Sequence, residues 1–380
     1  MPAFDELTTL RVGGPADDYR EVSTEAEFIE TIRECDDAGV PLLVLGGGSN
    51  LVVSDEGFAG VVVRDVRSGV SPQSQDACGG VSFDVVAGHS WDALVLEAIE
   101  NDWVGFEALS GIPGTVGAAP VQNIGAYGQE VAGAVANVRV WDRVAGAVRT
   151  FAASRLGFGY RSSMLKASMS AATELPGAPW YPSPAYVVLS VSFQVRLASL
   201  SAPIAYGELA RTLGVEVGSR VPNSAVREAV LALRGGKGML LDDPTRPDYD
   251  RWSAGSFFTN PIIPVELAAD LPDGAPRYPV RSPLPQFTTG PSLGAVREDV
   301  VKTSAAWLIE HAGYPKGYGI AGEDSPARLS TKHTLAVTNR GSASASDVIA
   351  LAREVRSGVQ QRFGIRLEAE PVLVGVSLDE

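Results

Sequence analysis

The segment SAGSFFTNP, residues 253–261, holds a hydroxyl whose surroundings are unusual for a reactive group. Ser256 lies between a glycine and two phenylalanines, with neither a GxSxG motif nor a neighbouring histidine to activate it as a nucleophile. A serine in a glycine-containing turn commonly bonds its own backbone. The residue types alone therefore favour a turn serine, and they leave open what chemistry a hydroxyl fixed in this setting would perform.

Four charged side chains lie in glycine-rich or apolar segments. Arg161, in GFGYRSS, can hold a carboxylate through two parallel hydrogen bonds, and a structural salt bridge is the alternative. Arg234 and Lys237, in LRGGKG, lie on a predicted glycine-rich turn that suits a diphosphate, and a solvated basic loop is the alternative. Glu370, in LEAE, is either the residue of an edge strand or a buried functional acid.

Two glycine-rich segments are candidates for binding a large anionic ligand. GGGSN, residues 46–50, lies between predicted strands, where glycines let backbone N–H groups approach a phosphate; a plain tight turn is the alternative. SGIPGTVGAAPVQNIGAYG, residues 110–128, has more glycine than a packed helix or strand would tolerate, which favours a backbone lying flat against a planar or pyrophosphate-bearing ligand. The formal matches GYGIAG and SMLK lack the strand, helix or partner motifs that the GxGxxG and SxxK signatures require.

Composition limits the classes of function. The chain has 380 residues, enough for two or three domains, and its net charge of −14 makes nucleic acid and anionic membranes unsuitable partners. Cys35, Cys78 and the three histidines are scattered and predict neither a disulfide framework nor a metal site. Because the chain shows no signal-peptide layout and no long apolar run, we expect a cytoplasmic protein without membrane insertion or an obligate protein partner.

Hydrophobic spacing and capping signals predict the elements that must position these residues. The first 65 residues are predicted to form a βαβ unit, in which Thr24 and Glu27 make a capping box and the helix ends at Gly39. Residues 166–185 have loop composition, and eight prolines between 261 and 291 predict an extended loop. The other predicted elements are strands at 81–88, 186–195 and 366–376, a helix capped by Ser90, a hairpin over 137–151, and helices over 223–233, 303–313 and 346–364.

In their order along the chain, these motifs resemble the UDP-N-acetylenolpyruvoylglucosamine reductase (MurB) family of flavoenzymes. The resemblance covers nearly the whole chain, through TTLRVGGPAD, LGGGSNLVVSDEGFAG, LSGIPGTVGAAPVQNIGAYGQE, FGYRSS, AYGEL, AGSFFTNP, AAWLIEHAG and LEAE. Three features depart from the family: LEAEPV stands where LEPEV is frequent, Thr259 replaces a frequent lysine, and GYGIAG replaces a segment that often carries an amide near the nucleotide. We align Glu370, and not Glu368, with the functional acid because it is the later of the pair.

The resemblance implies a fold and a division of the chain. The expected fold class is α+β, with an FAD-binding region of the vanillyl-alcohol-oxidase (PCMH) type made of two subdomains, residues 1–66 and 67–220. An α+β substrate-binding domain follows at 221–365, and a C-terminal strand, 366–380, returns to the flavin site. AYGEL, around Tyr206, matches the first structural class of the family, in which this tyrosine lies on a loop over the bound substrate.

The resemblance also implies ligands and the residues that bind them. FAD would be bound without a covalent tether, NADPH would be the co-substrate, UDP-N-acetylglucosamine enolpyruvate would be the substrate, and no metal is implied. Catalytic roles fall on Arg161, Ser256 and Glu370. Substrate-binding roles fall on Tyr127, Tyr160, Tyr206, Lys237 and Asn260, and cofactor-binding roles on Gly46, Gly47, Gly48, Ser49, Asn50, Ser110, Gly111, Gly114, Thr115, Gly117, Ala118, Gln122, Asn123, Gly125, Ala126 and Gly128.

The implied reaction, which belongs to peptidoglycan synthesis, has two halves. NADPH passes a hydride to N5 of FAD, and N5 then gives it to C3 of the enolpyruvyl group, so that an enolate develops at C2 and the carboxylate. An enolate carbon is basic enough to take the proton of Ser256, while Arg161 and Glu370 stabilise the developing charge. A flavin oxidase of the same cofactor fold and a non-catalytic nucleotide-sugar-binding protein are the alternatives.

Overall fold

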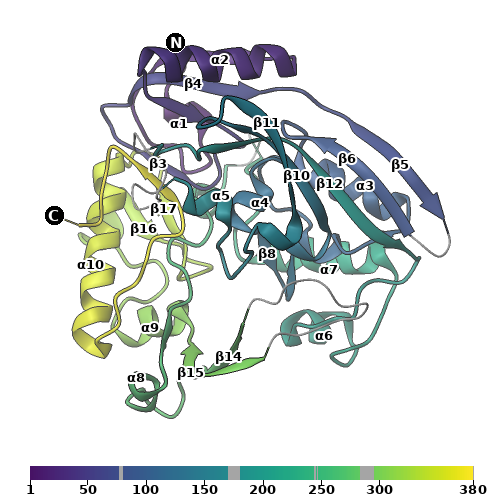
Figure 1. The fold of residues 1–380 in the computed structure, drawn as a ribbon. Coiled ribbons are helices and arrows are strands. Elements are labelled where there is room, and N and C mark those ends of the chain that lie inside the picture. The colour runs from purple at the N-terminus through teal and green to yellow at the C-terminus, as the bar shows by residue number, and fades with distance from the viewer. Residues whose placement is uncertain (77–79, 170–179, 244, 246, 283–294, 380) are drawn as a thin grey trace. The chain divides into compact units, whose positions relative to one another are not determined.

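The computed structural model describes residues 1–76, 80–169, 180–243, 245, 247–282 and 295–379 (Figure 1). The chain divides into two compact units. Unit 1 is formed by residues 1–16, 48–58 and 236–380, and unit 2 by residues 17–47 and 59–235. The chain therefore passes from one unit to the other inside GGGSN, between Gly47 and Gly48. The predicted division at residues 66, 220 and 365 separates cofactor-binding from substrate-binding parts and is not a division into compact units, so it stays a prediction.

The predicted βαβ unit opens the chain, and α2 lies along β4 in Figure 1. Its elements are β1 (Ala16–Val22), α2 (Glu25–Ala38), β2 (Leu42–Val44) and β4 (Phe58–Asp65), with sheet order β1-β4-β2 and β2 parallel to β4. Thr24 and Glu27 form the predicted capping box, and Gly39, at φ 65°, ends the helix as predicted. Phe28 and Ile32 of α2 are buried in one cluster with residues of all three strands.

A larger antiparallel sheet forms the centre of unit 2. Its strands follow the order β11-β10-β12-β6-β5, and β7 pairs with β12. They are β5 (Val70–Asp76), β6 (Gly80–Val86), β7 (Trp103–Val104), β10 (Val135–Asp142), β11 (Ala147–Ala152) and β12 (Tyr186–Leu197). The predicted hairpin over 137–151 and the predicted strand at 186–195 are confirmed. So is the helix that Ser90 caps, α3 (Trp91–Glu100), whose residues Trp91 and Leu94 are fully buried in the core of this sheet.

Short elements surround the glycine-rich segment of unit 2. They are η1 (Glu107–Leu109), α4 (Ala119–Gln122), β8 (Gly125–Ala126), β9 (Gln129–Glu130), η2 (Val131–Gly133), η3 (Ala153–Arg155), α5 (Met164–Ala167), α6 (Gly207–Leu213) and α7 (Asn223–Gly236). The helix predicted over 223–233 continues to Gly236, so Arg234 belongs to a helix and not to the predicted turn. Part of the predicted loop at 166–185 is helical, since α5 extends to Ala167, and its residues 170–179 lie outside the described residues.

Unit 1 packs small sheets against two helices. Its elements are α1 (Phe4–Leu7), β3 (Leu51–Val53), η4 (Tyr249–Arg251), β13 (Ile262–Pro264), α8 (Val265–Ala269), β14 (Tyr278–Arg281), β15 (Val296–Lys302), α9 (Ala305–His311), η5 (Gly322–Asp324), β16 (Ala327–Leu329), β17 (Val337–Asn339), α10 (Ala345–Phe363) and β18 (Val372–Val374). The predicted helices over 303–313 and 346–364 are confirmed as α9 and α10. Phe257 and Phe258, each 1% exposed, lie in the same apolar cluster as Leu308 and Val355 of these helices.

Two predictions for unit 1 were wrong. The first part of the proline-rich segment is not an extended loop but forms β13, α8 and β14, while residues 283–294 lie outside the described residues. Proline is tolerated there because β13 and β14 are the outer strands of the sheet β13-β15-β14. The strand predicted at 366–376 is reduced to β18, because Pro371 has no N–H to donate to a ladder; before it, Ala369 makes only an isolated bridge to Phe258.

No helix of the described residues has the length and apolarity needed to span a membrane. Among the same residues, no group of histidine, cysteine, aspartate and glutamate side chains could hold a metal ion.

Candidate active site

The two predicted cofactor loops touch each other in unit 2. A Cβ added to Gly47 would lie 2.6 Å from the Cα of Gly114, and one added to Gly46 would lie 3.1 Å from Oγ1 of Thr115. Carbon atoms in packed proteins are separated by about 3.5–4.0 Å. Gly47 therefore has to be glycine for the two backbones to approach this closely, which the sequence could not show because the segments are far apart along the chain.

The segment of residues 110–128 is tethered at its start to α3 and α7. The N–H of Gly111 donates to Oδ1 of Asp92 at 2.6 Å, and Arg227 donates to both carboxylate oxygens of Asp92 at 2.7 and 2.8 Å. Burial by itself raises the pKa of Asp92, but the hydrogen bonds from Arg227 and Gly111 outweigh it, so the pKa lies below its usual range. Sequence reasoning missed Asp92 and Arg227, because nothing in their local sequence shows that they pair.

Asn123 joins this segment to the turn that carries Arg161. It is fully buried and left-handed, at φ 45°. Its Nδ2 donates to Oε2 of Glu130 at 2.9 Å and to the carbonyl of Gly159 at 2.8 Å, and its Oδ1 accepts from the N–H of Ala132 at 3.2 Å. These bonds engage both ends of the amide, so the cofactor contact predicted for Asn123 would have to come from its backbone.

Arg161 lies in a tight turn closed by paired hydrogen bonds between Gly159 and Ser162, at 3.0 and 3.1 Å. It has a φ of 51°, which is uncommon outside glycine and clusters at functional sites. Its Nη2 donates to the carbonyl of Gly125 at 2.8 Å, and its guanidinium lies 5.4 Å from the ring centre of Tyr160. The guanidinium is thus directed at the end of the glycine-rich segment, beside one predicted substrate-binding tyrosine.

Tyr127 lies at the tip of the β8–β9 hairpin. Tyr127 and Gly128 have φ of 48° and 85°, as a two-residue hairpin of type I′ requires, and a Cβ on Gly128 would lie 2.9 Å from Cβ of Ala205. The ring of Tyr127 meets the ring of Tyr206 edge to face, with centroids 5.9 Å apart. Burial raises the pKa of Tyr127 to about 12, so its hydroxyl stays protonated and able to donate. The structure therefore brings together two tyrosines predicted to bind substrate.

Arg234 completes the charged groups around this hairpin. Its Nε donates to the carbonyl of Gly111 at 3.1 Å. Burial lowers its pKa, and the nearby Tyr127 and Asp92 act in the opposite direction. The sequence predicted Arg234 as a diphosphate-binding residue on a turn. It lies instead in α7, and its side chain contacts the glycine-rich segment of residues 110–128.

Ser256 and Glu370 come together in unit 1. The N–H of Glu370 donates to the carbonyl of Phe257 at 2.9 Å, and the N–H of Thr259 donates to the carbonyl of Glu368 at 3.0 Å. Asn50 lies on the other side, where its Nδ2 donates to the carbonyl of Glu370 at 3.3 Å. Three segments far apart in sequence thus lie side by side, with Glu370 between a predicted cofactor residue and the segment of the predicted proton donor.

The two acids of LEAE have different surroundings. The side chain of Glu368 is 71% exposed, and its carboxylate lies 3.7 Å from Nε of Arg366. Glu370 is half-buried. This difference supports the choice of Glu370 as the functional acid.

The remaining predicted substrate residues of unit 1 lie near helix ends. Lys237 directly follows α7 and is half-buried, next to Gly238 at φ 68°. Asn260 accepts from the N–H of Ala305 at 2.9 Å, so its side-chain oxygen stabilises the start of α9. A role for Asn260 in nucleotide binding stays a prediction. Arg161 belongs to unit 2 and Ser256 and Glu370 to unit 1, and their meeting in one site also stays a prediction.

The remaining predicted cofactor residues lie along the same two segments. Ser110 is fully buried and donates to the carbonyl of Glu107 at 2.7 Å, and the N–H of Gly117 donates to the carbonyl of Ala87 at 2.8 Å. A Cβ on Gly48, at φ 62°, would lie 2.0 Å from the carbonyl oxygen of Leu7. Ala118 precedes α4, Gln122 ends it, Ala126 belongs to β8, and Ser49 adjoins Asn50 ahead of β3.

These features fit a bound FAD. Of the described residues around the glycine-rich segment, Gln122 has a buried Nε2 without a hydrogen-bond partner. A buried donor without a partner is costly, and an acceptor of the cofactor would satisfy it. The three atoms nearest to a Cβ on Gly47 would all be backbone atoms of Gly114, so the two segments meet as bare backbone, whose N–H groups can bind a phosphate.

Comparisons with known proteins match most of the chain. A family profile described as FAD binding domain matches residues 17–151, and one described as UDP-N-acetylenolpyruvoylglucosamine reductase, C-terminal domain, matches residues 246–374.

Whole proteins match as well. The UDP-N-acetylenolpyruvoylglucosamine reductase of Cutibacterium acnes is 50% identical over 98% of this chain and 89% of its own length, and that of Thermobifida fusca is 48% identical over 98% and 97%. The crystal structure of the enzyme of that name from Thermus caldophilus covers 98% of this chain and 97% of its own, with a TM-score of 0.59 and 26% identity.

Proposed function

Because this chain belongs to the UDP-N-acetylenolpyruvoylglucosamine reductase family, we propose that it reduces UDP-N-acetylglucosamine enolpyruvate to UDP-N-acetylmuramate, with NADPH as the electron donor, in peptidoglycan synthesis. The family matches confirm the predicted fold class, the oxidoreductase class and FAD as the cofactor. A cytoplasmic location and the lack of nucleic-acid and obligate protein partners stay predictions from composition.

One observation carries the assignment of chemistry to this chain's own residues. Glu370 hydrogen-bonds the carbonyl of Phe257, so an acid from the end of the chain lies beside the segment of Ser256. Phe257 and Phe258, each 1% exposed, anchor that segment in the core. A hydroxyl held by such an anchor has a fixed position, which general acid catalysis requires of the proton donor.

We assign the chemistry as follows. Bound FAD would accept a hydride from NADPH and supply it to C3 of the enolpyruvyl group. Ser256 gives its proton to C2, since the developing enolate carbon is basic enough to take it. Arg161 stabilises the negative charge on the carboxylate by its own charge, and Glu370 acts as a hydrogen-bonding acid at the same charge.

The other assigned residues bind. Tyr127 and Tyr206 form the edge-to-face pair that would enclose the substrate, and the raised pKa of Tyr127 keeps it a neutral donor. Lys237 attracts the diphosphate toward a chain of net charge −14. Gln122 and the touching backbones of Gly47 and Gly114 hold FAD.

The purified protein tests the assignment of the reaction. Incubation with NADPH and the enolpyruvyl substrate under nitrogen and under air should give the same substrate-dependent consumption of NADPH. Consumption that needs oxygen would instead identify a flavin oxidase, and no consumption would leave a binding protein.

Ser256→Ala tests the assignment of the proton donor. Flavin reduction by NADPH should stay close to normal, while the half-reaction with the enolpyruvyl substrate should slow by about 100-fold or more. The matched control is Thr259→Val, which removes a hydroxyl on the same segment that only approaches the carbonyl of Glu368 at 3.5 Å. Equal slowing of both half-reactions by Ser256→Ala would make the serine a structural residue.

A further inference from the structure

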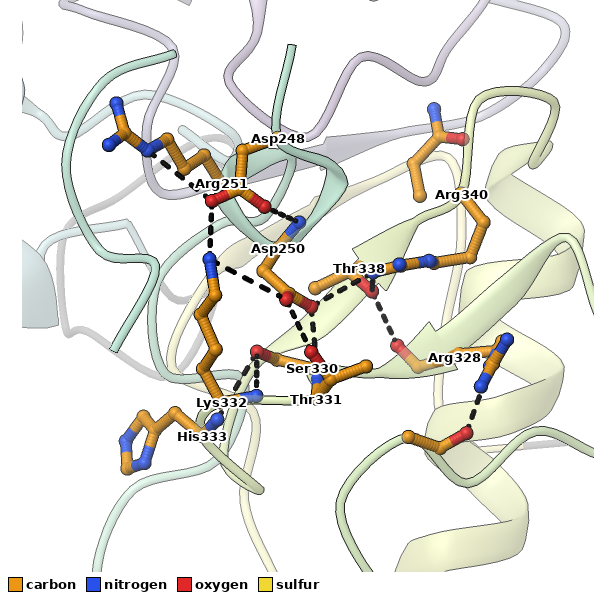
Figure 2. Close-up of polar contacts among 12 residues, drawn as sticks. Asp248, Asp250, Arg251, Arg328, Ser330, Thr331, Lys332, His333, Thr338 and Arg340 are labelled. Atoms are coloured by element: carbon orange, nitrogen blue, oxygen red, sulfur yellow. Dashed lines mark hydrogen bonds and ion pairs between the residues drawn. The ribbon is translucent and has the colours of Figure 1, made fainter. Parts of the chain in front are cut away.

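A buried ionic network lies upstream of Ser256, in a part of unit 1 that the reaction above does not use (Figure 2). Asp250 is 4% exposed, and its carboxylate accepts from the N–H of Thr331 at 2.9 Å, from Oγ1 of Thr331 at 2.5 Å and from Nη1 of Arg340 at 2.9 Å. Nζ of Lys332 lies 3.9 Å from Asp250 and donates to Asp248 at 2.5 Å. A buried carboxylate with these partners is neutralised and held in one orientation.

The network fixes the loop of residues 330–336, which connects β16 to β17. Oγ of Ser330 accepts from the N–H groups of Lys332 and His333 at 3.1 and 3.2 Å, and the N–H of Ser330 donates to the carbonyl of Ala336 at 2.8 Å. The loop is attached to the rest of unit 1 at several points: the carbonyl of Ser330 accepts from the N–H of Gly317 at 3.2 Å, Thr331 bonds Asp250 through both backbone and side chain, and Oγ1 of Thr334 donates to Glu310. Among these attachments, the bonds of Thr331 fix the loop relative to Asp250 and to the segment that follows Asp250 in the chain.

The same loop and β17 hold the segment around Ser256. The N–H of Phe257 donates to the carbonyl of Leu335 at 2.7 Å, and Ser253 forms an isolated bridge with Thr338. Ser256 thus lies between two attachments to the β16–β17 hairpin: Ser253, three residues before it, and Phe257, directly after it. Gly255, at φ 74°, makes the turn between them.

We propose that Asp250 is a positioning residue for the reductase reaction: it fixes the 330–336 loop, whose Leu335 carbonyl holds Phe257 and thereby the hydroxyl of Ser256. The proposal rests on the role proposed above for Ser256. The backbone of Asp250 also contacts the Lys237 segment, since a Cβ on Gly238 would lie 2.9 Å from the carbonyl oxygen of Asp250. Loss of the carboxylate alone should therefore act on the proton transfer, whereas a shift of the backbone would also change substrate binding.

Asp250→Asn removes the charge and keeps the shape of the side chain. Its matched control is Asp55→Asn, also in unit 1, because Asp55 likewise accepts three hydrogen bonds, from the N–H of Ala345 at 2.6 Å and from the N–H and Oγ of Ser346 at 3.0 and 2.7 Å. Asp55 stabilises the start of α10 and touches neither the 330–336 loop nor Ser256 through these bonds. Thr331→Val, which removes one of the three donors, is a milder variant that still serves if Asp250→Asn does not fold.

The holoenzyme is assayed for its two half-reactions. Asp250→Asn should slow the half-reaction with the enolpyruvyl substrate by about 10-fold or more, with flavin reduction by NADPH and the substrate KM each changed by less than about threefold. Asp55→Asn should leave all three unchanged. In a Ser256→Ala background, Asp250→Asn should cause no further slowing, because the group that it positions is gone. A rise in KM alone, additive slowing in the double variant or an equal effect of Asp55→Asn would each overturn the proposal.

Amide hydrogen exchange provides a readout independent of activity. Asp250→Asn should speed exchange of the Phe257 N–H by about 10-fold or more, while Asp55→Asn leaves it unchanged. If the wild-type protein does not reduce the enolpyruvyl substrate, the proposed function fails and exchange still decides whether Asp250 fixes this segment. Unchanged protection of Phe257 in Asp250→Asn would overturn the positioning role even in an active reductase.

Discussion

Adding one methyl group to Gly47 should separate the two glycine-rich segments and weaken FAD binding. The added Cβ of Gly47→Ala would lie 2.6 Å from the Cα of Gly114, and about 1 Å of displacement is needed to restore an ordinary carbon contact. Forcing a methyl group into a packed contact costs about 1–3 kcal/mol. Since each 1.4 kcal/mol is a factor of ten, the Kd for FAD should rise about 5- to 150-fold if the apoprotein relaxes by moving the loops apart.

Two further glycines give a graded series in unit 2. Gly46→Ala would place its Cβ 3.1 Å from Oγ1 of Thr115, a side-chain atom, so its effect on FAD affinity should be smaller. Gly133→Ala is the matched control, because its Cβ would meet no heavy atom within 4 Å and its backbone is not left-handed. The expected order of FAD affinity is Gly133→Ala equal to wild type, then Gly46→Ala, then Gly47→Ala.

The assay is titration of each apoprotein with FAD, followed by flavin fluorescence, with thermal unfolding of the apo and holo forms measured in parallel. If the strain is not relieved in the apoprotein, the FAD affinity changes less and the apo Tm falls instead, by about 1–2 °C for each kcal/mol in a chain of 380 residues that unfolds cooperatively. A Gly47→Ala protein with wild-type FAD affinity and wild-type Tm would refute the close contact of the two segments.

The other expected outcomes concern the cofactor, the substrate and pH. The flavin should be released intact by heat or acid, because the bound cofactor is expected to have no covalent tether; a flavin that stays with the denatured chain would contradict this. Lys237→Ala should raise the substrate KM at low salt, and the effect should shrink as salt increases, because part of it is a screened charge attraction; unchanged affinity at low salt would make Lys237 a surface residue. Asp92→Asn should lower the free energy of unfolding at pH 7, and the difference from wild type should shrink as pH falls below about 4. The reason is that the pKa of Asp92 is lowered in the folded state. The stabilisation by its carboxylate is therefore complete above the unfolded pKa and is lost as pH falls through the folded pKa. Denaturant unfolding from pH 7 to pH 3 measures this, and a difference that does not vary with pH would contradict the charged bonds to Arg227 and Gly111.

The sequence by itself determined the elements whose signals are local. The capping box of Thr24 and Glu27, the end of α2 at Gly39 and the cap of α3 at Ser90 all depend on residues within one helical turn of each other, and all are as predicted. The ordered motifs also determined the family. Local signals failed where tertiary pairing decided the outcome. The proline-rich segment forms β13 and β14 because β15 pairs with both. The shortening of the last strand to β18 has a local cause instead, since Pro371 is visible in the sequence and the prediction of one strand overlooked it.

Only the tertiary structure decided how the candidate site is held. The resemblance to the family nominated Ser256, Arg161 and Glu370, but the hydrogen bond from the N–H of Glu370 to the carbonyl of Phe257 and the bond from Arg161 to the carbonyl of Gly125 depend on segments brought together by folding. The supports were not predictable at all. Asp92 and Asp250 are ordinary acids in sequence, and they become fixed points because burial makes an unpaired carboxylate costly and each finds its partners on a distant element.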